Sequence, residues 1–298
     1  MSFEQLMQHA HDIIEKGAAL AFKQHGGITI DKFRWALQFV EPLFEPFSRM
    51  PDPASYDPLI TELTMAMQKL MTQSTPATKL SQDVAFVGTH LDKIQADSDY
   101  LQGWDGRGAM AFKTEVLGSF KTRTGNLFTA LSTMRGVLQA HQEMWRNARD
   151  DIDKIAETTL NALDHADASS DPATLPFVFS VLAAVGTVTA GIITIATGGA
   201  TAPIVAIGSA ASVGSASVAG SKMESGTTCD SIIKSMSQAI DDLTAHIHWV
   251  EMGDMTAKIV DINSAISGNK KLFVSDPPKL AGMNDRDLMG DNGMGRLS

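Results

Sequence analysis

The chain has 298 residues, a formal net charge of −10 and a single cysteine. An acidic chain whose Lys and Arg residues are not clustered lacks what nucleic-acid phosphates require, so we expect no nucleic-acid partner. The same charge disfavours adhesion to anionic lipid by simple electrostatics. One cysteine excludes an intramolecular disulfide and leaves the redox compartment open.

Aromatic residues make up only 6% of the chain, whereas Ala, Met, Leu and Gly are plentiful. That mixture favours helices over a β-sandwich, and we predict an all-α fold: an elongated antiparallel helical bundle with a hydrophobic helical hairpin between two long helices. Residues 1–5 show no basic region followed by an apolar core. We therefore expect no ordinary signal peptide, and a leaderless route if the protein is exported.

Residues 1–50 are predicted to form a small helical appendage. Ser2 and Gln5 resemble a capping box, and the apolar residues behind them recur on one helix face. Gly26–Gly27 should end this helix, and a second, shorter helix should begin near Asp31. The inward residues of the second helix are Phe33, Leu37, Val40 and Phe44.

Residues 56–165 are predicted to form a helical hairpin around the glycine-dense turn Gly103–Gly108. Before the turn, apolar spacing predicts helix from about Tyr56 to Asp99, interrupted at most near Thr75–Pro76. The second half of that stripe consists of Val84, Val87, Leu91 and Ile94. After the turn, more than fifty residues without a proline, from Phe112 to Leu163, predict one long helix of about 75 Å.

The most unusual part of the sequence is a run of fifty residues, Pro172 to Ser221, that contains no charged side chain. Its first half, Phe177–Ala196, would span about 30 Å as a helix, the thickness of a bilayer's hydrocarbon core. Residues 198–203 are typical of a turn, and small residues every fourth place in the second half, Ile204–Gly220, would let two helices approach closely.

These features predict a hairpin that can enter a membrane. The residues assigned to this membrane hairpin are Phe177, Val181, Val185, Gly186, Gly191, Ile192, Gly208, Ser212, Ala216 and Gly220. Two alternatives remain open: an apolar helix pair buried inside a soluble bundle, and a β-hairpin, which the Val and Thr content permits. Since aromatic belts and flanking basic clusters are missing, a soluble protein that inserts is favoured over a constitutive membrane protein.

A return helix is predicted from about Lys222 to Ser267, with a heptad seam that Gly253–Asp254 disturbs. Cys229 occupies a seam position and is expected to be a small buried hydrophobe. Residues 275–298, rich in Asp, Gly, Pro and Met, show no periodicity and are predicted to be disordered.

The Trp104-Asp105-Gly106 turn, with helix on both sides and small residues directly after it, resembles the WXG100 family of type VII secretion substrates. The resemblance covers about residues 56–165 and implies an antiparallel helical hairpin in which Trp104 packs against the helix ends and Gly106 supplies backbone freedom. The family's secretion signal, a Tyr four residues before an acidic residue, is not matched, so a partner protein would have to supply it.

The order of elements, long helix, hydrophobic hairpin, long helix, is similar to the α-helical pore-forming toxins of the cytolysin A and haemolysin BL type. That resemblance implies a hairpin hidden in the soluble form and released onto a target membrane. It depends on the arrangement alone and carries no sequence motif.

No phosphate-binding glycine loop, Cys-X-X-Cys pair or His-Glu-X-X-His motif occurs, and the eight histidines are scattered. His9/His11 and His246/His248 are spaced by two, which points each pair to nearly opposite sides of a helix. We therefore expect no catalysis, metal, cofactor or small-molecule substrate. The expected partners are protein helices, further copies of the chain, or a lipid membrane.

The sequence thus predicts a non-enzymatic, secreted WXG100-like protein with a membrane-inserting hairpin, found in the medium, at the cell envelope or on a target membrane. The alternatives are a pore-forming toxin unconnected with type VII secretion and an intracellular helical scaffold or chaperone.

Overall fold

The computed structural model describes residues 3–71, 84–88, 90–94, 101, 103, 106–168, 193–194, 206–207 and 228–275. These residues are helical apart from connections and two strands of two residues each, so the predicted all-α class is confirmed. The chain divides into two compact units. Unit 1 comprises Met1–Asp57, Gln139–Val188 and Ser212–Met255, and unit 2 comprises Pro58–Leu138, Thr189–Ala211 and Thr256–Ser298.

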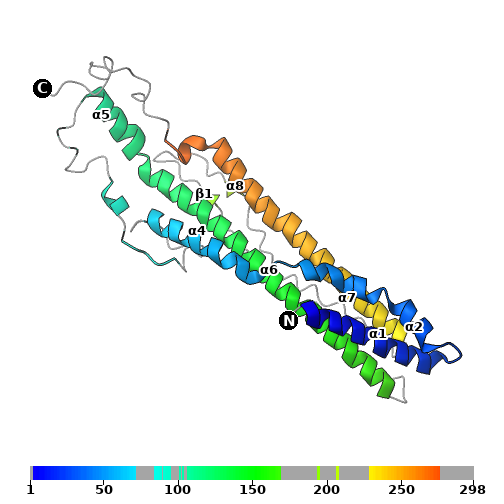
Figure 1. The fold of residues 1–298 in the computed structure, drawn as a ribbon. Coiled ribbons are helices and arrows are strands. Elements are labelled where there is room, and N and C mark those ends of the chain that lie inside the picture. Colours follow the sequence, from blue (N-terminus) through cyan, green and yellow to red (C-terminus); the bar gives the residue numbers. More distant parts are fainter. Residues whose placement is uncertain are drawn as a thin grey trace. The chain divides into compact units, whose positions relative to one another are not determined.

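Unit 1 is a bundle of helices that pack around a shared apolar core (Figure 1). Its helices are α1 (Phe3–His25), α2 (Ile30–Leu37), α3 (Val40–Phe44), the C-terminal part of α6 (Phe120–Ala168) and α7 (Cys229–Trp249). Short 3-10 helices, η1 (Glu45–Arg49) and η2 (Pro53–Tyr56), follow α3, and a π-helix, η6 (Val250–Met255), follows α7.

Contacts between side chains give the helix directions in unit 1. Lys16 and Lys23 of α1 meet Asp164 and Asp167 of α6 in the same order, so these two helices run parallel. The turn at Gly26–Gly27, where both residues have positive φ, reverses the chain into α2. α7 begins beside Gln24 near the end of α1 and packs back along that helix, so it runs antiparallel to α1 and α6 (Figure 1). The predicted antiparallel packing of helices is therefore confirmed.

The core of unit 1 is a single apolar cluster to which all of these helices contribute. Its largest fully buried side chains are Phe44, Ile13, Leu20, Ile152, Ile155, Leu163, Ile232, Met236 and Leu243. The appendage predicted for residues 1–50 is thus an integral part of the bundle. Leu37, Val40 and Phe44 are buried as the helical spacing predicted.

Unit 2 is built on the N-terminal part of α6, which two other helices contact. α4 (Asp57–Leu70) places Met67 against Phe128, and α8 (Thr256–Gly268) places Ile262 and Ala265 against Ala130. After α8 the 3-10 helix η7 (Lys270–Leu272) is held by the amide of Asn126, which donates to the carbonyl of Leu272 at 2.9 Å.

The helix predicted from Tyr56 to Asp99 is wrong in part. α4 ends at Leu70, residues 84–88 have no helical structure, and a 3-10 helix, η3, covers only His90–Lys93. Val84 is buried because it packs with Met67 and Phe128 of unit 2. Its apolar side chain therefore marks a buried position in a segment that is not helical.

The long helix predicted from Phe112 to Leu163 is interrupted near its start. The chain forms α5 (Arg107–Ala111) and a π-helix, η5 (Phe112–Leu117), before α6 begins at Phe120. Gly118 closes the π-helix by donating its N–H to the carbonyl of Lys113, and a Cβ at this position would lie 2.7 Å from the carbonyl oxygen of Thr114. A side chain at residue 118 would therefore collide with the preceding turn.

Within the uncharged stretch the structure describes only four residues, and these form strands instead of the predicted helices. β1 (Ile193–Thr194) pairs antiparallel with β2 (Ala206–Ile207), with Ile193 opposite Ile207. Ile and Thr are β-branched residues that fit extended backbone well. The rest of the predicted hairpin lies outside the described residues.

Candidate functional site: the stems of the uncharged stretch

The end of α6 and the beginning of α7 are the two stems that carry the uncharged stretch Pro172–Ser221. Both stems contact the same element, the last turn of α1, and all of these contacts lie inside unit 1. We call this set of contacts the stem site. It contains Gly17, Lys23, Gln24, Asp167 and Cys229.

At the first stem, Lys23 caps the C-terminus of α6. Its Nζ donates to the carbonyl oxygen of Asp167 at 2.7 Å and to the Asp167 carboxylate at 3.0 Å. The last carbonyls of a helix have no partner within the helix, and a cation there also interacts favourably with the helix dipole. One turn earlier, Lys16 pairs with Asp164 at 2.6 Å. Because these side chains are largely exposed, each pair contributes only about 0.2–1 kcal/mol.

At the second stem, Gln24 caps the N-terminus of α7. The backbone N–H of Cys229, one of the first N–H groups of the helix and without an intrahelical partner, donates to Oε1 of Gln24 at 3.1 Å. Thr228 is the N-cap residue and accepts a hydrogen bond from the N–H of Ser231. One turn of α1 therefore caps both helices that border the uncharged stretch.

Gly17, about two turns before these caps on α1, lets α1 and α7 approach closely. The thiol of Cys229 donates to the carbonyl oxygen of Gly17 at 3.2 Å. A Cβ at residue 17 would lie 2.9 Å from Leu37 Cδ1 and 3.5 Å from the sulfur of Cys229. Glycine therefore leaves room at this point for side chains of both α2 and α7.

Cys229 is buried, as its seam position predicted, with 1% of its surface exposed. Burial, with a smaller contribution from Asp230, raises the pKa of its thiol to about 11 from an ordinary value of 9.0. The neutral thiol is thus the form that the stem site accommodates. A thiolate at the Gly17 carbonyl would lose both its solvation and its hydrogen bond.

This pKa predicts a loss of stability at high pH. Between pH 9 and 11 the unfolded thiol ionises while the folded thiol stays protonated, so the free energy of unfolding falls as the pH rises through this window. We expect the wild-type protein to lose about 2–3 kcal/mol more than Cys229→Ala over that range, measured by urea unfolding at each pH. Other groups titrate equally in both proteins, and parallel curves would contradict the prediction.

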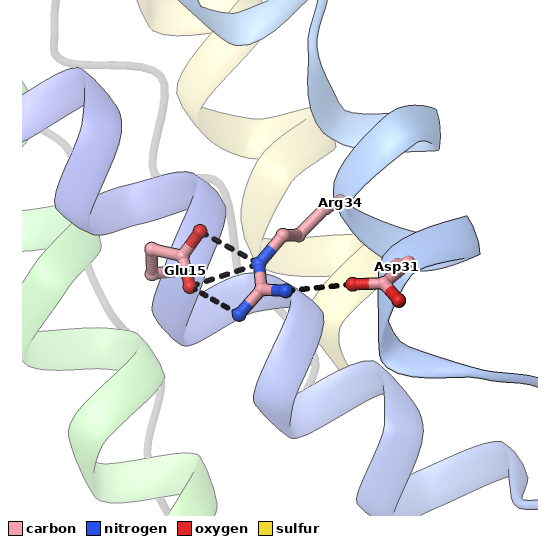
Figure 2. A network of polar contacts seen from close by, with 3 residues as sticks. All are labelled: Glu15, Asp31 and Arg34. Carbon is pink, nitrogen blue, oxygen red and sulfur yellow. Dashed lines mark hydrogen bonds and ion pairs between the residues drawn. The ribbon is translucent and has the colours of Figure 1, made fainter.

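A charged network fixes α2 against α1 beside the stem site. Figure 2 shows Arg34 between two carboxylates: Nε donates to Glu15 at 2.7 Å, and Nη1 donates to Asp31 at 2.8 Å. The hydrogen bonds from Arg34 hold the pKa of Glu15 below its ordinary value. The guanidinium thereby sets the register of the α1–α2 hairpin and holds Leu37 near Gly17.

A second polar cluster lies where α7 passes into the π-helix η6. His141 on α6 contacts Glu251 at 2.9 Å, and its ring packs edge-on against Tyr56 and at a tilt against Trp145. Burial raises the pKa of Tyr56, Glu251 adds to the rise, and the neighbouring Trp145 opposes it. His141 is half-buried and has a carboxylate partner.

Two α6 side chains also hold the connection at residues 50–57. Arg149 Nη2 donates to the carbonyl of Met50 at 2.9 Å, and Gln142 Nε2 donates to the carbonyl of Pro53 at 2.8 Å. These contacts bind the C-terminal end of the α1–η2 region to α6 through polar groups. They brace unit 1 and assemble no nucleophile, base and orienting group.

The structure describes only part of the predicted turn motif. Gly106 is the N-cap of α5, and both it and Gly103 have positive φ, of 107° and 84°. This is the backbone freedom for which glycine was expected. Trp104 lies outside the described residues, as do all ten residues assigned to the membrane hairpin.

Sequence reasoning missed the stem site itself. A usable signal was present: His9, Lys16 and Lys23 repeat at intervals of seven on α1, and each meets an aspartate of α6. His9 Nδ1 lies 3.6 Å from Asp153. A row of basic residues at heptad spacing predicts a neighbouring helix with acidic residues on the facing side.

In the part of the chain that the structure describes, none of the helices combines the length and the apolar character needed to cross a bilayer. Among the same residues there is no group of three or more His, Cys, Asp or Glu side chains placed to hold a metal ion. No protein-family model, curated protein or solved structure matches the chain.

Proposed function

We propose that this is a non-enzymatic, membrane-active helical protein in which residues 172–221 leave the bundle and enter lipid. The observation that carries the proposal is a run of fifty residues without charge, tethered at both ends to one helical bundle. A charged residue at the centre of a membrane helix is disfavoured by about 2.5–3.5 kcal/mol, and this run contains none.

Each half of the run is long enough to cross the hydrocarbon core as a helix. In lipid, backbone N–H and C=O groups must be satisfied within the segment, so we expect both halves to become helical there. The two-residue ladder between β1 and β2 would be given up in that step. The bundle of unit 1 then serves as the anchor outside the bilayer.

Dye release from lipid vesicles tests this function. Purified protein should release dye from phosphatidylcholine vesicles, and the double variant Val185→Asp, Ile192→Asp should release it at least about tenfold more slowly, because each Asp adds more than 1.4 kcal/mol to the insertion free energy. The acidic chain should act less on vesicles that contain phosphatidylglycerol.

Val260→Asp is the matched control, because Val260 is an exposed valine of α8 outside the uncharged run. It changes the charge by one unit, as each Asp in the test variant does, and should leave release unchanged. Release that is equal in the wild type and the double variant would remove residues 172–221 from the mechanism. A protein that releases no dye and binds one helical partner would instead be a scaffold or chaperone.

We further propose that the protein is exported as a WXG100-like substrate of type VII secretion. The Trp-X-Gly turn and the positive φ of Gly106 at the start of α5 support this route. The protein should accumulate in culture medium only while the secretion apparatus is intact. Equal release from cells that lack the apparatus would contradict the proposed export.

A further inference from the structure

We propose that the α1–α2 hairpin is a clasp on the stems of the uncharged stretch, and that α1 must leave the stem site before residues 172–221 enter lipid. This inference rests on the proposed function and adds the step that regulates it. The clasp consists of described residues only: Lys23 at the end of α6, Gln24 and Gly17 at the start of α7, and Arg34 behind them.

α1 acts as a clasp through its caps. A capping side chain and a lengthened helix compete for the same backbone N–H and C=O groups at the helix end. The N–H of Cys229 carries one hydrogen and donates it to Gln24. If α7 grew toward the uncharged stretch, the same hydrogen would have to bond the carbonyl of residue 225, four positions earlier. Thr228, whose backbone is extended with ψ of 147°, would also have to become helical. While α1 stays in place, the Gln24 cap opposes growth of α7 before Cys229.

The clasp can open without loss of the whole bundle. At the stem site its bonds are partly exposed caps and ion pairs, which contribute little individually because solvent screens them. The apolar core continues below this point through Ile13, Phe44 and Met236. Local opening at a helix end therefore requires much less free energy than global unfolding. Opening must lift α1 away from Cys229 over Gly17 to Gln24, which frees both the thiol and the N–H of Cys229.

A single substitution can lock the clasp, because the chain already supplies one cysteine at this position. A Cβ at residue 17 lies 3.5 Å from the Cys229 sulfur, which suits a disulfide after a small adjustment. The same Cβ would lie close to Leu37, but the atom it meets is the terminal methyl Cδ1 of a flexible side chain, which can rotate away. Gly17→Cys should thus form a cross-link between α1 and α7 under oxidising conditions.

The test compares dye release from phosphatidylcholine vesicles by Gly17→Cys before and after reduction. We expect the oxidised form to release dye at least about tenfold more slowly than the reduced form, because a disulfide typically shifts an equilibrium by more than that. The double variant Gly17→Cys, Cys229→Ser carries the same new side chain and cannot cross-link, so its release should not depend on the redox state. Mass spectrometry confirms the cross-link, and circular dichroism confirms folding.

Three results overturn the clasp. Equal release by the oxidised and reduced forms, with the cross-link confirmed, removes the clasp and leaves the membrane function standing. Redox-dependent release by the double variant would show that the cross-link is not the cause. Absence of release by the reduced variant and the wild type alike overturns the proposed function and, with it, the clasp.

Substitutions that remove the caps test the clasp independently of the cross-link, with dye release as the measurement. Lys23→Ala, Gln24→Ala removes both caps and should release dye faster than the wild type. Lys32→Ala, on the same hairpin, removes one cation from outside the stem site and should not change the rate. A rate for the double variant that equals the wild-type rate would contradict the clasp.

Discussion

Phe44→Ala should lower the free energy of unfolding of unit 1 by about 3–5 kcal/mol, since the ring is fully buried in the cluster that joins α1, α6 and α7. Truncation removes the transfer free energy of the ring and leaves a cavity that neighbouring helices fill only in part. Urea unfolding followed by circular dichroism measures the change. Hydrogen exchange of the α1 amides assigns it to unit 1.

Trp35→Ala is the matched control for this aromatic truncation. Trp35 lies on the neighbouring helix α2 and is 74% exposed, so its removal should change the free energy of unfolding by no more than about 0.5 kcal/mol. If Phe44→Ala lowered the free energy of unfolding by less than about 1 kcal/mol, α3 would not be packed in the core as described.

The cross-linked form of Gly17→Cys should be more stable than its reduced form by about 2–4 kcal/mol. The two joined positions are 212 residues apart, so the cross-link restricts a very long loop of the unfolded chain. Unfolding of the same variant in both redox states measures the effect. The comparison is clean, because any strain against Leu37 is present in both forms. An oxidised form of equal or lower stability would mean that α1 and α7 do not hold this spacing in solution.

Local signals predicted the helices well where glycine or apolar spacing decides the structure. Gly26–Gly27 ends α1 because both residues adopt positive φ, which side chains disfavour. Gly253 was expected to disturb the return helix, and η6 is a π-helix at that place. The seam position of Cys229 predicted its burial, since spacing by threes and fours marks the inner face of a helix.

Other features depend on contacts between distant residues, which no local pattern encodes. Lys23 and Asp167 are 144 residues apart, and Gln24 and Cys229 are 205 apart. The sequence near Val84 has helical spacing, yet its burial comes from packing against α4 and α6. Gly118 is the one residue of the local sequence that indicates the interruption before α6. A side chain at this position would collide with the carbonyl of Thr114, and that collision can be seen only once the π-helix is known.

The buried thiol of Cys229 allows the opening of α1 to be measured in the unmodified protein. Cys229 is the only cysteine of the sequence, it is buried, and its sulfur contacts Gly17 of α1. A small alkylating reagent can therefore reach sulfur only during the intervals when that helix is lifted. The labelling rate in plain buffer, divided by the rate for the denatured chain, gives the fraction of time that the protein spends open, without any added probe.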